Sequence, residues 1–132
     1  MGNANSINVI TTIKKFNFED VQLARMNKNN IIINTLPEDN QSCIIPGTIN
    51  INDEVTILNN YLNSNKAIQI IIYGKNNNDT KIFLKYKQLT DLGFTNVVIY
   101  AGGMFEWLLL QEIYSDDNFP TTEKEIDILK FK

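Results

Sequence analysis

The chain has 132 residues, of which 43% are hydrophobic and 20% are charged, and its net charge is −3. This length and composition fit a single globular domain that can bury a core without disulfides or a metal. One cysteine and no histidine exclude an internal disulfide, catalysis that depends on histidine, and histidine-ligated zinc. The acidic balance lacks the phosphate-neutralising surface of a nucleic-acid binder, and no apolar run is long enough to span a membrane. We therefore expect no nucleic-acid partner, no metal and no cofactor.

The first half of the chain alternates between strand-like and helix-like segments. The predicted strands are 8–12, 30–34 and 48–51, and the predicted helices are 18–26 and 53–62. Asn17 is a suitable N-cap for the first helix, whose buried side should carry Phe18, Val21 and Ala24. The second helix should bury Val55, Leu58 and Leu62. Between the second and third strands, residues 36–47 form a loop that ends in a Pro-Gly turn.

The second half repeats this alternation. The predicted strands are 67–73 and 96–100, and the predicted helices are 79–92, 104–111 and 122–131. The core positions expected in helix 79–92 are Ile82, Phe83, Tyr86, Leu89 and Leu92. Gly93 should end that helix in a left-handed conformation, and Thr122 with Glu125 indicates a capping box for the last helix. Because apolar strands are separated by helices, we expect an α/β fold with a mostly parallel central sheet and helices on both faces.

Five stretches, in this order, resemble the motifs of a rhodanese-like domain, the sulfurtransferase fold shared with the cell-cycle dual-specificity phosphatases. They are Ile-Ile-Ile-Asn-Thr-Leu at 31–36, Cys-Ile-Ile-Pro-Gly-Thr at 43–48, Ile-Ile-Ile-Tyr-Gly at 70–74, Leu-Gly-Phe-Thr-Asn-Val at 92–97 and Ala-Gly-Gly-Met-Phe-Glu-Trp at 101–107. The resemblance implies a rhodanese-like domain over residues 8–115, preceded by a flexible N-terminus over 1–7 and followed by a C-terminal extension with a short helix over 116–132.

The resemblance also implies a lost active site. In the family, a cysteine at the carboxyl end of the central strand begins a loop whose N–H groups form an anion-binding nest and make a reactive thiolate. Gly74 stands at that position here, and Asn34, Leu36 and Ile44 replace an acid, an arginine and a histidine of the family. We therefore expect no catalytic residue and no sulfur transfer. The degenerate active-site loop consists of Gly74, Lys75, Asn76, Asn77, Asn78, Asp79 and Thr80.

This loop and the single cysteine each have two interpretations. The loop is either a solvated turn with Asp79 or Thr80 as the N-cap, or a weak anion site that uses Lys75 and backbone N–H groups. Cys43 is either a small buried residue or a displaced nucleophile. The nearest charges in the sequence, Glu38 and Asp39, are of the wrong sign to activate a thiol.

The amino terminus carries a separate signal. The sequence from Gly2 to Ser6 fits the N-myristoylation pattern; the alternative is a frayed start before the first strand. A single myristoyl chain binds membranes weakly, no cysteine lies near Gly2 for a second acyl chain, and Lys14 and Lys15 add little basic charge. Attachment would therefore be reversible, and we expect a cytoplasmic protein with peripheral membrane contact.

Taken together, these features favour a non-catalytic binding or scaffold module with a protein partner. The alternatives are an active sulfurtransferase or phosphatase-like enzyme, in which another residue acts, and a small-anion or ligand sensor that uses the empty loop. The region of Tyr114, Phe119 and Pro120, beside Asp116 and Asp117, is either a partner surface or a loop that packs back on the domain.

Overall fold

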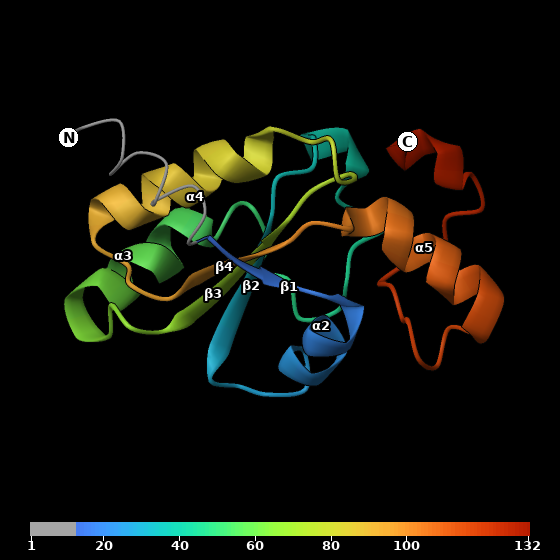
Figure 1. Ribbon diagram of the computed structural model, residues 1–132. Coiled ribbons are helices and arrows are strands. Elements are labelled where there is room, and N and C mark those ends of the chain that lie inside the picture. Colours follow the sequence, from blue (N-terminus) through green and yellow to red (C-terminus); the bar gives the residue numbers. More distant parts are fainter. Residues whose placement is uncertain (1–12) are drawn as a thin grey trace.

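The computed structural model describes residues 13–132 (Figure 1). The predicted strand 8–12 and the N-terminal segment 1–7 lie outside these residues. Within them, all strands belong to one sheet in the order β1-β4-β3-β2, and each neighbouring pair is parallel. The strands are β1 (Lys14–Phe16), β2 (Asn30–Asn34), β3 (Gln69–Tyr73) and β4 (Val97–Tyr100). The α/β fold with a parallel sheet predicted from the sequence is confirmed.

Helices cover both faces of this sheet (Figure 1). One face packs against α2 (Phe18–Ala24), α5 (Gly103–Tyr114) and the short 3-10 helix η2 (Ile128–Phe131). The other face packs against α3 (Glu54–Ser64) and α4 (Lys81–Leu92). A further 3-10 turn, η1 (Glu38–Asn40), lies in the loop after β2.

The isoleucine-rich strands are buried on both sides because successive side chains point to opposite faces. In β2, Ile32 faces the layer of α2 and α5, while Ile31 and Ile33 face the layer of α3 and α4. The register that pairs Ile31 with Ile70 continues this alternation in β3. A continuous apolar run of this kind is typical of a strand covered by helices on both sides.

Two helix ends follow the predicted local chemistry. The Asn17 side chain accepts a hydrogen bond from the Asp20 N–H at 2.9 Å, and Asp20 accepts one from the Asn17 N–H at 3.0 Å, which forms a capping box. Gly93 ends α4 with φ of +116°, where a glycine carries no steric penalty. Helix α2 stops at Ala24, two residues earlier than predicted.

Three predicted core positions on the helices are wrong. Val55 is 69% exposed, because α3 turns Ile57, Leu58 and Tyr61 toward the sheet instead. Phe83 and Leu92 are 42% and 49% exposed, because α4 buries a stripe centred on Ile82 and Leu89 that leaves them at its margins. Helical spacing therefore located the buried side of each helix but not its width.

The predicted capping box at Thr122 is also wrong. The Thr122 hydroxyl donates to the Ser42 carbonyl at 2.7 Å and accepts from the Ile44 N–H at 3.1 Å. Glu125 pairs with Lys130 at 3.0 Å instead of capping a helix. The last helix is therefore only the short η2, and Thr122 fastens the C-terminal segment to the loop that contains Cys43.

The C-terminal segment contributes to the main core. Phe119 and Phe131 are 3% and 1% exposed, and both belong to the buried cluster that contains Trp107. The Trp107 ring lies 5.1 Å from the Phe119 ring, and its indole N–H donates to the Pro120 carbonyl at 2.8 Å. The loop that carries Phe119 thus packs back on the domain, and the interpretation of Phe119 as an exposed partner contact is wrong.

Candidate functional site

The carboxyl ends of the parallel strands bring the predicted loop together with two other turns. The loop 74–80 follows β3, Thr35 and Leu36 follow β2, and the turn at Gly102 and Gly103 follows β4. Ligands of open α/β sheets bind at this edge, where side chains and helix starts from several strands converge. This edge of the sheet is therefore the candidate site.

The Asp79 carboxylate fills the interior of the loop. Its Oδ2 accepts a hydrogen bond from the Lys75 N–H at 3.1 Å and from the Thr35 hydroxyl at 3.4 Å. Its Oδ1 accepts from the N–H of Lys81, the first residue of α4, at 3.0 Å. An internal carboxylate thus takes the donors that an external anion would otherwise use at a loop and helix start. This geometry matches the interpretation of the loop as a capped turn.

Polar side chains hold the rest of the loop. The Asn76 side chain accepts from the Asn78 N–H at 2.8 Å and donates to the Phe131 carbonyl at 2.8 Å. The second bond joins the loop to the C-terminal segment, a contact that no motif in the sequence predicts. Asn77, Asn78 and Thr80 are exposed.

The start of α5 supports the loop from behind. The N–H groups of Met104 and Phe105 donate to the carbonyls of Gly74 and Lys75 at 3.0 and 2.8 Å. Gly103 has φ of +67°, and a Cβ added there would lie 2.7 Å from the Gly74 carbonyl oxygen. Only glycine fits this contact, because any side chain would be both strained and in collision with backbone. The requirement for glycine in the Gly102-Gly103 turn therefore lies at Gly103.

Gly74 is buried directly behind the Asp79 carboxylate. A Cβ on Gly74 would lie 2.3 Å from Asp79 Oδ2 and 2.7 Å from Thr35 Oγ1. The loop in its present form therefore has no room for a side chain at this position, and a side chain there would require Asp79 to move.

The other positions singled out by the sequence have structural roles. The Asn34 side chain is 3% exposed; its oxygen accepts from the Leu36 N–H at 3.0 Å and from the Gln41 amide at 2.7 Å. Leu36 is buried in the core, and Ile44 is half-buried against the same cluster. Asn34, Leu36 and Ile44 have no ionisable side chain, so these positions carry no acid or base for proton transfer.

Residues 17–110 match the family model described as Rhodanese-like domain. The chain belongs to this family. Its fold is similar to that of the Alr3790 protein from Anabaena sp., with 20% identity, a TM-score of 0.57, and coverage of 87% of this chain and 86% of that one. It is also similar to the BH2092 protein from Bacillus halodurans, with 15% identity, a TM-score of 0.55, and coverage of 99% and 98%. No curated protein matches the sequence.

The one cysteine of this rhodanese-like domain lies outside the loop and is 4% exposed. Burial raises the pKa of the Cys43 thiol, and a hydrogen bond with Thr121, which acts in the opposite direction, does not offset it. Lys130 and Glu125 also lie near the thiol, and their charges oppose each other. Sequence reasoning missed Thr121 and Lys130 because they follow Cys43 by many residues and reach it only through tertiary packing.

Two hollows adjoin the loop of the rhodanese-like domain. The first has a volume of about 370 Å³ and is lined by Pro37, Lys75, Asn76, Asn78, Asp79, Lys81 and Lys132. The second has a volume of about 390 Å³ and is lined by Asn34, Thr35, Leu36, Ile51, Glu54, Lys81, Leu84, Lys85 and Gln88. Of these residues, Lys81, Leu84 and Lys132 were not predicted from the sequence, since no motif marks them.

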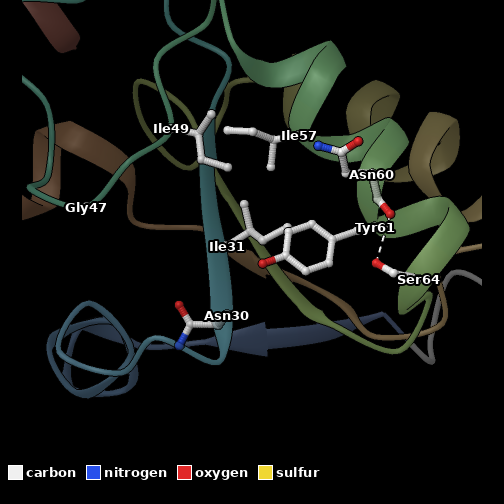
Figure 2. Close-up of a pocket in the computed structure, with 8 residues that line it drawn as sticks. All are labelled: Asn30, Ile31, Gly47, Ile49, Ile57, Asn60, Tyr61 and Ser64. Atoms are coloured by element: carbon white, nitrogen blue, oxygen red, sulfur yellow. Dashed lines mark hydrogen bonds between the residues drawn. The ribbon is translucent and has the colours of Figure 1, made fainter.

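Figure 2 shows a third hollow, of about 460 Å³, between the start of β2 and α3. Ile31, Ile49 and Ile57 form its apolar wall, and the Tyr61 ring lies beside Ile31. Asn30 begins β2, so this hollow lies at the amino end of the strands, away from the loop. Its lining holds no acid, amine or thiol, and its one serine hydroxyl, Ser64, donates to the Asn60 carbonyl at 2.8 Å with no general base among the lining residues.

Two further findings concern metals and membranes. Among residues 13–132, no group of three or more acidic, cysteine or histidine side chains is placed to hold a metal ion. In the same part of the chain, no helix has both the length and the apolar character needed to cross a bilayer.

Proposed function

We propose that this rhodanese-like domain is a non-catalytic binding or scaffold module. One observation carries the proposal: the Asp79 carboxylate occupies the loop directly in front of Gly74, where the family resemblance places the nucleophile. A loop that is filled by its own carboxylate can present a fixed surface, but it has no thiolate, and the N–H groups of Lys75 and Lys81 already bind Asp79.

The chemistry of the residues supports this proposal. Sulfur transfer and thiol-dependent phosphate hydrolysis both require a thiolate that attacks the substrate and carries the transferred group. Gly74 has no side chain, and Cys43 is buried with its pKa raised. The alternative of a small-anion sensor would need the Lys75 N–H that already donates to Asp79.

Turnover measurements test the proposal directly. The purified chain should show no thiosulfate:cyanide sulfur transfer and no hydrolysis of p-nitrophenyl phosphate above a protein-free control. Cys43→Ser provides the matched variant, because Cys43 is the only thiol in the chain. Turnover in the wild type that disappears in Cys43→Ser would establish the enzyme alternative and refute the proposal.

A second variant tests the role of Asp79. Gly74→Cys should restore little activity, since the adjacent carboxylate disfavours the thiolate and the supporting acid, arginine and histidine are still missing. Gly74→Cys combined with Asp79→Ser removes that carboxylate and its steric conflict. On a Cys43→Ser background, the new thiol should react with iodoacetamide faster in the double replacement than in Gly74→Cys alone.

We also propose that the module is attached reversibly to membranes through a myristoyl chain on Gly2, which lies outside the described residues. The pattern from Gly2 to Ser6 supports this proposal. One acyl chain binds weakly, and a net charge of −3 opposes adsorption to anionic lipid. After co-expression with an N-myristoyltransferase, intact mass should show the added acyl group, and Gly2→Ala should shift the protein from the membrane fraction to the soluble fraction. An unmodified mass would refute the anchor.

A further inference from the structure

The two hollows beside the loop adjoin each other but differ in chemistry. The lysine hollow is the one bordered by Lys75, Lys81 and Lys132. The leucine hollow is the one bordered by Leu36, Ile51 and Leu84. Lys81 lines both, and the hydrogen bond of 3.4 Å from Thr35 to Asp79 joins their walls. Together they form one surface with a cationic part and an apolar part.

The lysine hollow has an excess of positive charge. Asp79 is the one side-chain carboxylate among its lining residues, and two backbone N–H groups and a hydroxyl already bind it. None of the three lysines forms an ion pair within residues 13–132. Glu38 and Asp39 follow Pro37 in the chain but line neither hollow, and the charge of Asp39 acts on Lys130. The three ammonium groups are therefore available to a partner.

The leucine hollow is partly apolar, and apart from the shared Lys81 its charges are balanced. Glu54 and Lys85 neutralise each other in an ion pair of 2.7 Å at its wall. Leu84 is 69% exposed, although an aliphatic side chain of this size gains from being covered. An apolar group from a partner would cover Leu84 while its neighbouring groups reach the lysines.

We propose that the paired hollows bind an acidic segment of a protein partner, with its carboxylates at Lys75, Lys81 and Lys132 and an adjacent apolar side chain against Leu84. The proposal rests on the proposed function, because it uses the loop as a docking surface and not as a catalytic one. Charge complementarity carries it: an excess of ammonium groups selects carboxylates and increases the rate of encounter with them. Nucleic acid and anionic membranes are extended polyanions that would also face the rest of a chain with a net charge of −3, whereas a short acidic segment contacts the lysine hollow alone.

Selection from a displayed library of random short peptides tests the proposal with a defined probe. Peptides retained by the wild-type chain should carry aspartate or glutamate next to an aliphatic or aromatic residue. A labelled peptide with the selected consensus should bind about tenfold or more weakly to Lys75→Gln/Lys81→Gln and to Leu84→Ser. Its affinity should also fall as salt is added, since ions screen the lysine charges.

Matched control variants separate this surface from general effects of charge and hydrophobicity. Lys87→Gln removes a lysine from the same helix whose side chain is 74% exposed and lines neither hollow. Ile113→Ser removes an exposed aliphatic side chain from α5. Both controls should bind the peptide as the wild type does, and circular dichroism should show that all variants fold.

Several results would overturn the proposal. These are failure to select any peptide, selection of peptides without acidic residues, and equal binding by Lys75→Gln/Lys81→Gln. If inorganic phosphate at the peptide's own concentration displaces the peptide, the lysine hollow binds a small anion. That result would also refute the proposal of an acidic protein segment. Peptides that bind the lysine variant equally would refute this surface but leave a non-catalytic binding module intact. Turnover in the assays described above would refute the proposed function whatever the peptides do.

Discussion

At the scale of single residues, Trp107 joins the sheet, α5 and the C-terminal segment. Its side chain is fully buried, and its ring packs edge-on against Phe119 and Tyr100 at 5.1 and 6.3 Å. Its indole N–H is satisfied by the Pro120 carbonyl at 2.8 Å. A buried tryptophan contributes both a large apolar area and a directed hydrogen bond, so few substitutes can replace it.

Trp107→Ala should therefore lower the free energy of unfolding by about 3–5 kcal/mol, because it leaves a cavity and an unsatisfied carbonyl. Denaturant melts of the wild type and the variant measure this loss. Leu109→Ala on the same helix is the control, since Leu109 is 37% exposed and its truncation should cost less than about 1 kcal/mol. A loss below about 1 kcal/mol for Trp107→Ala would contradict the burial of the Trp107 ring.

At the scale of elements, the start of α5 and the loop after β3 act as one unit. The carbonyls of Gly74 and Lys75 bind the first N–H groups of α5, so a change at Gly103 should be transmitted to the loop. Gly47 provides a matched comparison. It also has positive φ, at +96°, but the nearest atom to an added Cβ is 3.8 Å away.

Gly47→Ala should thus show mainly the backbone strain of a positive φ, about 1 kcal/mol. Gly103→Ala should cost clearly more, because its Cβ must also displace the Gly74 carbonyl and the Asn76 amide at 2.7 and 2.9 Å. Denaturant melts compare the two losses, and amide hydrogen exchange at Lys75 should rise only in Gly103→Ala. Equal losses with unchanged exchange would show that α5 does not hold the loop.

The elements that sequence reasoning predicted correctly are those fixed by local patterns. The isoleucine runs of β2 and β3 specify strands, Asn17 with Asp20 specifies a helix start, and Gly93 specifies a helix end. The family motifs also pointed to the loop after β3, but no motif places the Asp79 carboxylate inside it. That contact depends on how the loop closes over Thr35, which lies more than forty residues earlier.

The errors arose where tertiary contacts overrule local signals. Thr122 has the spacing of a helix cap, yet it bonds to Ser42 and Ile44 in a distant loop. Phe131 is the last residue of the predicted helix 122–131, yet it lies in the core cluster that contains Cys43. These partners are separated by most of the chain, and a single sequence carries no signal that pairs them.

At the scale of the whole molecule, three ionisable side chains of the core make the stability of the fold depend on alkaline pH. Burial raises the pKa of Cys43, Tyr73 and Tyr100 above their ordinary values. The Tyr100 hydroxyl donates to Glu106 at 2.7 Å, and this bond and the negative charge of Glu106 raise the pKa of Tyr100 further. The chain has no histidine to titrate between about pH 6 and pH 8.

Because of these groups, we expect the free energy of unfolding to change little around neutral pH and to fall steadily above about pH 9. In the unfolded chain the thiol and the phenols lose protons near their ordinary pKa values, about 8.5 and 10, whereas the folded protein keeps them protonated. Above those values the unfolded state binds fewer protons than the folded state, so the free energy of unfolding falls as pH rises, by up to about 1.4 kcal/mol per pH unit for each group.

Urea melts at several pH values measure this slope. Tyr100→Phe should reduce the slope above about pH 10, and Tyr114→Phe, whose ring is 62% exposed, should leave it unchanged. A wild-type stability that rises or stays level from about pH 9 to pH 11 would contradict the protonated, buried state of these side chains.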